Sequence, residues 1–294
     1  MSLNIIYIPF RQIVCKIPLW RYLSFITPCL FPNPNASVLS QYGSIFNLSL
    51  PKSWADLSDP HLLFFFRQLA TDKPMAEIQT LCLCHWANIL VRCCLYGSVY
   101  LVQHGKQQAT LTLHQFVCAI TALDFLKSFP PYPIRIRTFG KARAIAANFQ
   151  GVPFSTFISA DNHYQGSLHT KNEALLGQLA TLLYPKVKSR HLTTPLLLNA
   201  FYWFSSLKHY FARLFPHFLQ PISSSSEDLL GYAPPIGEVL RTAMNAQIRA
   251  LTGGDITKEE AVLSMDTWRA LTELDAKAKE VEDIKRQTKW QKDN

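Results

Sequence analysis

Apolar residues recur at spacings of three and four along most of this chain, and helix-start signals precede several of these runs. Ser58 and Pro60 open one run, and Thr112 with Gln115 forms a capping box before another. Because 48% of the residues are apolar, the chain can bury a substantial core. The pattern predicts a mainly α fold with a helical, bundle-like body.

Two further elements are predicted within this helical fold. Short β-branched runs flank His104, Gly105 and Lys106, which is typical of a β-hairpin. Near the C-terminus, Trp268, Leu274 and Val281 belong to an apolar series with helical spacing. We therefore expect one small β-hairpin in the body and a C-terminal helical hairpin.

Composition and charge divide the chain into four predicted parts. Residues 216–235 contain four consecutive serines and four prolines, which is typical of a linker. Charge changes sign there: residues 1–226 hold 19 basic and 7 acidic side chains, whereas residues 227–294 hold 10 and 13. The predicted parts are an N-terminal arm, a helical body, a linker and a C-terminal helical module: 1–43, 44–221, 222–235 and 236–294.

The N-terminal arm is apolar, but Arg11, Lys16 and Arg21 interrupt it. A membrane-spanning helix needs about 18 or more consecutive apolar residues, so we expect no integral membrane span here. Three interpretations stay open. Residues 1–31 can pack on the body, lie on a membrane surface as a peripheral anchor, or precede the true domain.

Seven cysteines, an odd number that includes neighbouring pairs, do not form a secreted disulfide pattern. We expect a reducing, cytoplasmic location. Residues 75–94 are predicted to form one helix, on which Cys82 and Cys84 point to different faces. The cysteines near His85 are therefore expected to act as small buried hydrophobes and to bind no metal.

No sequence motif for nucleophilic, nucleotide-dependent or metal-dependent catalysis is present. Asp161 and His163 suggest acid–base chemistry, but two residues apart on a helix their side chains diverge. We expect a non-enzymatic protein with no catalytic residue and no cofactor.

The most basic stretch, residues 134–144, alternates apolar and cationic side chains at its start. Ile134 and Ile136 would face the core of a strand. The cations can contact a phosphate, a nucleic acid or an acidic partner, or they can protect an exposed edge strand from pairing. The candidate anion contacts are Arg135, Arg137, Lys141 and Arg143.

Aromatic residues cover more than one face of the helix expected over residues 195–219. Such a helix lies in a core or at an interface. Together with the C-terminal hairpin over residues 257–287, it is predicted to form a surface for a protein partner. The candidate residues are Phe201, Trp203, Phe204, Tyr210, Phe211, Trp268, Leu271 and Leu274.

The C-terminal stretch MNAQIRALTGGDITKEEAVLSMDTWRALTELDAKAKEVEDIKR resembles the short helical endings of small proteins from tailed phages and prophages. The blocks LPKSWADLSDPHLLFFFRQLA, FQGVPFSTFISADNHYQG and LLYP are similar to uncharacterised proteins from the same context. This resemblance covers residues 44–290 and assigns no functional residue. It implies an assembly or structural component, including a virion-associated one.

The sequence leaves three functional hypotheses. The first is a protein-interaction protein, such as a phage or prophage tail-assembly component. The second is a nucleic-acid-binding protein that uses residues 135–143, and the third is a peripheral membrane protein that uses residues 1–31. The sequence fixes neither the partner nor the oligomeric state.

Overall fold

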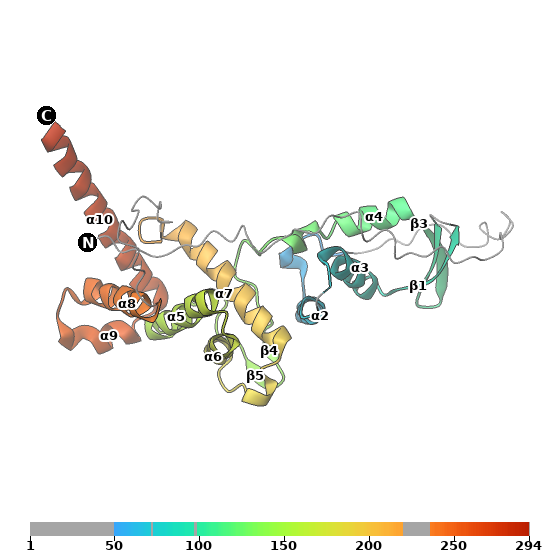
Figure 1. The fold of residues 1–294 in the computed structure, drawn as a ribbon, viewed down its shortest axis with the longest axis horizontal. Coiled ribbons are helices and arrows are strands. Elements are labelled where there is room, and N and C mark those ends of the chain that lie inside the picture. The colour runs from blue at the N-terminus through green and yellow to red at the C-terminus, as the bar shows by residue number, and fades with distance from the viewer. Residues whose placement is uncertain (1–49, 72, 97–98, 220–235, 294) are drawn as a thin grey trace. The chain divides into compact units, whose positions relative to one another are not determined.

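The fold is given by a computed structural model that describes residues 50–71, 73–96, 99–219 and 236–293. These residues divide into two compact units, one ending at Phe129 and one beginning at Pro130 (Figure 1). We call them the N-terminal unit and the C-terminal unit. The predicted arm, 1–43, and most of the predicted linker, 222–235, lie outside the described residues.

The N-terminal unit combines helices with one antiparallel sheet of strand order β1-β2-β3. Its helices and strands are η3 (Trp54–Asp56), α2 (Asp59–Leu69), α3 (Met75–Trp86), β1 (Ile89–Tyr96), β2 (Val99–His104), β3 (Gln107–Thr112), α4 (Leu113–Thr121) and η4 (Asp124–Lys127). The predicted hairpin is confirmed: His104 pairs with Gln107 across a turn in which Gly105 has a φ of 59°. The predicted Thr112–Gln115 capping box is also present.

The stretch that we predicted as one helix over residues 75–94 is in fact a helix followed by a strand. Helix α3 ends at Trp86, and Asn88 adopts a left-handed φ of 51° that turns the chain. Ile89 then enters the sheet and is buried there. Helical spacing extends to Ile89 by coincidence, because the β-branched Ile89 and Val91 also favour a strand.

Two side-chain hydrogen bonds connect the helices of the N-terminal unit to the segment after α4. The indole N–H of Trp54 donates to the carbonyl oxygen of Phe125 at 3.0 Å. The side-chain amide of Gln79 donates to the carbonyl oxygen of Leu123 at 2.9 Å. Both acceptors belong to the segment after α4, so this segment is held against α3 and η3.

The surroundings of His61 predict that the stability of the N-terminal unit depends on pH. Its Nδ1 accepts a hydrogen bond from the Ser58 backbone N–H at 3.4 Å, at the start of α2. Burial, and secondarily the charge of His85, lowers the pKa of His61 below 6.5. The folded state therefore binds this proton less readily than the unfolded state, so stability present above pH 6.5 is lost as the pH falls through the folded-state pKa.

We expect the melting temperature to fall more between pH 7 and pH 5 in the wild-type protein than in His61→Gln. Glutamine keeps an acceptor near the helix start and does not titrate in this range. Thermal unfolding followed by circular dichroism at both pH values measures the difference. Equal losses in the two proteins would contradict this role of His61.

The C-terminal unit is built from helices around one aromatic core, with a two-stranded hairpin at one end (Figure 1). Its helices and strands are β4 (Thr138–Phe139), β5 (Ala142–Arg143), α5 (Phe154–Thr170), α6 (Glu173–Leu183), η5 (Ser189–His191), α7 (Thr194–Leu214), α8 (Ile236–Thr252), η6 (Ile256–Lys258), α9 (Glu259–Ser264) and α10 (Thr267–Asp293). Helix α7 supplies several of the largest buried side chains of this core, including Trp203, Phe204 and Phe211.

The predicted C-terminal module is part of this core and forms no separate unit. The Phe154 N–H donates to the Met265 carbonyl at 2.8 Å, and the Thr267 N–H donates to the Val152 carbonyl at 2.9 Å. Leu271 belongs to the same buried cluster as the α7 aromatics. The boundary between units therefore lies at residue 130 and not at 222–235, because a change in charge along the chain does not prevent apolar faces from packing together.

A smaller correction concerns the turn after α8. Thr257 and Glu260 match a capping box in sequence. In the structure, however, the Asp255 carboxylate accepts from the Thr257 N–H at 3.0 Å, and a short 3₁₀ helix follows. Asp255 takes the capping role because it directly follows two glycines, Gly253 and Gly254, whose positive φ values reverse the chain.

The fold is mainly α, as predicted, with a small antiparallel sheet and a C-terminal pair of helices. Within the described ranges, no helix combines the length and hydropathy needed to cross a bilayer.

Candidate anion-binding surface

Residues 134–137 form no strand, which corrects the predicted alternation of apolar and cationic faces. The Ile136 N–H donates to the side-chain oxygen of Asn199 at 3.1 Å, and its carbonyl accepts from the Tyr184 hydroxyl at 2.7 Å. Because side chains of the helical core bind both backbone groups, the segment cannot pair as a strand edge.

Arg135 lies apart from the other three predicted anion contacts. Its guanidinium carbon is 5.4 Å from the centre of the Trp203 ring, a cation–π geometry, and its side chain is half-buried. Arg135 therefore packs against Trp203, and it is not one of the exposed cations among the four predicted anion contacts.

The remaining predicted cations lie around the β4–β5 turn and are exposed. Arg137 precedes β4, Lys141 follows Gly140 in the turn, and Arg143 is in β5. The Ala144 N–H donates to the Arg137 carbonyl at 2.9 Å, which closes the hairpin. Gly140 has a φ of 61°, so the tight turn suits glycine at this position. A short, closed hairpin thus presents three cations.

A second basic loop begins beside this hairpin and was not among the predicted anion contacts. It runs from the end of α6 to the start of α7 and carries Lys186, Lys188 and Arg190, all exposed. Two hydrogen bonds join the ends of the two loops. The Ile145 N–H donates to the Leu183 carbonyl at 3.0 Å, and the Tyr184 hydroxyl donates to the Ile136 carbonyl at 2.7 Å. We call the six exposed cations of both loops the cationic surface.

Carboxylates are scarce around this surface. Residues 125–160 and 174–219 contain no Asp or Glu. Asp161 is occupied by Lys208, whose Nζ lies 2.8 Å from its carboxylate, and Glu173 begins α6, at the end opposite the basic loop. On the C-terminal helices, the carboxylate of Asp275 accepts a hydrogen bond from the His217 N–H. The two loops therefore carry six positive charges and no negative charge of their own.

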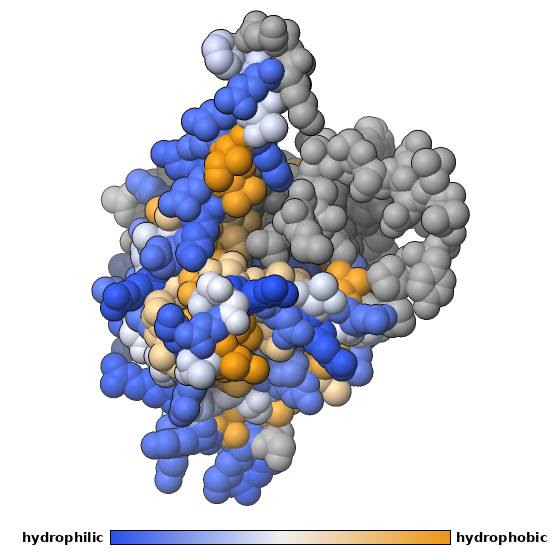
Figure 2. Space-filling view, turned by 90° about the vertical axis from the view of Figure 1, so that its left-hand side faces the viewer, coloured by the Kyte–Doolittle hydropathy of each residue, from blue (hydrophilic) through white to orange (hydrophobic). Residues whose placement is uncertain are grey.

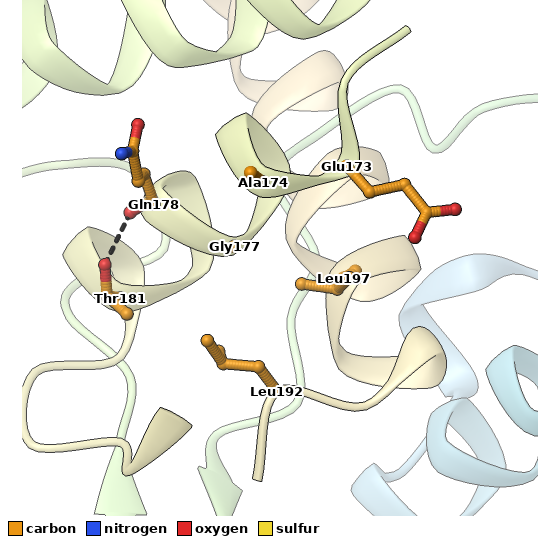
Figure 3. Close-up of a pocket in the computed structure, with 7 residues that line it drawn as sticks. All are labelled: Glu173, Ala174, Gly177, Gln178, Thr181, Leu192 and Leu197. Atoms are coloured by element: carbon orange, nitrogen blue, oxygen red, sulfur yellow. Dashed lines mark hydrogen bonds between the residues drawn. The ribbon is translucent and has the colours of Figure 1, made fainter. Parts of the chain in front are cut away.

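A pocket of about 390 Å³ opens between α6 and the segment that follows the basic loop. Figure 3 shows Leu192 and Leu197 pointing toward the face of α6 that carries Ala174 and Gly177. Gln178, Thr181 and Glu173 complete the lining, and the Thr181 hydroxyl donates to the Gln178 carbonyl at 2.7 Å. The pocket is mainly apolar and has polar groups at its rim.

The other reactive or metal-binding residue types do not come together in a site. Asp161 pairs with Lys208, whereas His163 lies two residues further along α5, where burial lowers its pKa. Cys82 is buried in α3, and burial raises the pKa of its thiol to about 12. Among the described residues, no three His, Cys, Asp or Glu side chains gather as metal ligands do.

The predicted partner surface is largely core. Trp203, Phe204, Phe211, Leu271 and Leu274 are buried within the C-terminal unit, while Phe201, Tyr210 and Trp268 pack against the same cluster. The interface interpretation is therefore wrong for the five buried residues: their apolar faces are already covered by the chain's own α5, α8 and α10.

Exposed apolar surface lies instead on the outer part of α10, which extends beyond the other elements of its unit (Figures 1 and 2). Here Val281 is 47% exposed, Ile284 61% and Trp290 71%. Asp275 holds the part of the helix before Val281, and the carboxylate of Glu282, on the same turn as Val281, lies 3.0 Å from His217 Nδ1.

Comparison with protein-family models, with curated proteins and with solved structures finds no match to this chain. A function is therefore inferred from the residues and their geometry alone.

Proposed function

We propose that this protein is a non-enzymatic nucleic-acid-binding protein whose cationic surface contacts the phosphate backbone. The observation that carries the proposal is that two basic loops, 137–143 and 186–190, lie next to each other. Hydrogen bonds join the residues at their ends. Regularly spaced phosphates match a group of exposed cations on two loops that contain no Asp or Glu.

Two features favour a nucleic acid over a solvated surface with no partner. The cations come from two segments about 50 residues apart, and the fold brings both to one place. Backbone hydrogen bonds also hold the loops: the Ala144 N–H donates to the Arg137 carbonyl at 2.9 Å, and the Val187 N–H donates to the Tyr184 carbonyl at 3.0 Å. Ordered loops lose less entropy when they bind a ligand.

Binding of a labelled oligonucleotide by wild-type protein, followed by fluorescence anisotropy, tests the proposal. If six cations each neutralise one phosphate of a single strand, log K should fall with log salt concentration with a slope of about −4. Single-stranded and duplex DNA and RNA should all be tried. An absence of binding at low salt, or a flat salt response, would refute the proposal.

A second candidate function, binding of another protein, is favoured by the exposed apolar residues of α10. Phage or prophage assembly is one setting for such a protein, and it stays a prediction from sequence resemblance. Light scattering after size exclusion checks this candidate with wild type and Val281→Glu/Ile284→Lys. A strictly monomeric wild-type protein with no co-purifying partner would count against it. Membrane association through residues 1–31 concerns residues outside the described ranges and also stays a prediction.

A further inference from the structure

We propose, on the basis of the proposed function, that the pocket beside the basic loop takes one unpaired nucleobase, so that the partner is a single-stranded nucleic acid. The pocket is lined by α6 and by the segment that leads into α7 (Figure 3). A phosphate contact alone would not distinguish a single strand from a duplex. The pocket supplies what the cationic surface lacks, namely a place for a base.

The chemistry of the pocket suits a planar heterocycle. Leu192 and Leu197 form the apolar part of the lining, and Ala174 and Gly177 keep the facing surface of α6 low because their side chains are small or absent. Leu192 approaches Gly177 to van der Waals distance, so a base would lie over the leucines at the open side of the pocket and not between Leu192 and Gly177. Figure 3 shows the Glu173 carboxylate and the Gln178 amide on opposite sides of the lining, so at most one of them can bind the polar edge of a given base. A volume of about 390 Å³ is at the lower end for small-molecule sites and is sufficient for one planar heterocycle.

The position of the pocket links it to the cationic surface. Leu192 in the pocket wall follows Arg190 by two residues, so their Cα atoms lie at most about 7 Å apart. Lys186 follows closely after the end of α6, the helix that lines the other wall. Phosphates on either side of a base in the pocket would therefore lie near cations of the basic loop, and the surrounding charge favours a nucleotide over a neutral apolar ligand.

Filling the pocket tests the inference. A Cβ built on Gly177 meets Leu192 Cδ1 at 3.8 Å and nothing closer, so Gly177→Ala should fit and leave most of the pocket open. Gly177→Leu places a larger side chain against Leu192, so one of the two leucines must extend into the pocket and reduce the space for a base. Both substitutions replace a helical glycine by a better helix former. Because Gly177→Leu also moves Leu192, circular dichroism and thermal unfolding must show that the variant is folded before its binding is compared.

Anisotropy is measured with a short single strand, as DNA and as RNA, with the same strand made abasic, and with a duplex. We expect Gly177→Leu to lower the affinity for the single strand about tenfold, as loss of one base contact does, at an unchanged salt slope. Gly177→Ala should bind like wild type. Abasic and duplex ligands should not distinguish the three proteins.

The possible outcomes separate this inference from the proposed function. If Gly177→Leu binds the single strand as tightly as wild type, or weakens duplex and abasic binding equally, the base site is wrong and the cationic surface still stands. If wild type binds none of the ligands, both proposals fail. A loss confined to base-bearing single strands supports the base site, and the DNA and RNA arms then identify the preferred backbone.

Discussion

Replacing Asp161 with alanine is expected to lower the free energy of unfolding of the C-terminal unit by about 3–5 kcal/mol. The Lys208 side chain is 8% exposed and its Nζ lies 2.8 Å from the Asp161 carboxylate, which is 19% exposed. Removal of the carboxylate leaves an ammonium group without its counter-ion between α5 and α7, and a buried unpaired charge is strongly destabilising. Urea unfolding followed by tryptophan fluorescence measures the change.

The matched controls are Lys208→Met and the double variant Asp161→Ala/Lys208→Met. Methionine keeps the length of the lysine chain without its charge, and the double variant leaves no charge at all. We expect the double variant to be less destabilised than Asp161→Ala, since replacing a buried pair by apolar residues is often close to neutral. Additive losses in the double-mutant cycle would show that the two side chains do not interact.

Neutralising the second basic loop is expected to lower nucleic-acid affinity roughly 50-fold at physiological salt, if each of three cations contacts one phosphate of a single strand. The variant is Lys186→Gln/Lys188→Gln/Arg190→Gln. These exposed side chains leave the core untouched, so stability should be unchanged. The slope of log K against log salt should also become shallower by about 2. Anisotropy titrations over a salt series give both quantities.

A control with the same change in net charge separates a site from a general charge effect. Lys277→Gln/Lys279→Gln/Lys285→Gln removes three charges from α10, away from both basic loops. It should bind nucleic acid nearly as wild type does. Similar losses in the two triple variants would mean that net charge, and not a surface, drives binding.

Helices and the hairpin were predictable because their signals are local. Ser58 and Pro60 open α2, Thr112 caps α4, and Gly105 turns the hairpin, each within a few residues of the element it specifies. Strand β1 was missed because its decisive partner is β2, and pairing between strands is not visible in the spacing of one segment.

The candidate site was only half predictable. Arg137, Lys141 and Arg143 stand out in sequence as a basic run, but Lys186, Lys188 and Arg190 belong to a different segment. They join the first loop through long-range hydrogen bonds such as that of Tyr184 with Ile136. Likewise, no sequence pattern distinguishes Arg135, which packs on Trp203, from the exposed arginines near it. The aromatic residues of α7 were ambiguous for the same reason: burial depends on helices that arrive later in the chain.

The most direct test of the cationic surface is lysine footprinting. The full-length protein is acetylated with and without a saturating oligonucleotide, and the labelled peptides are quantified by mass spectrometry. We predict protection of Lys141, Lys186 and Lys188, which come from both basic loops, and unchanged labelling of Lys279 and Lys285 on α10. Protection of the α10 lysines with full labelling of the two loops would contradict the account.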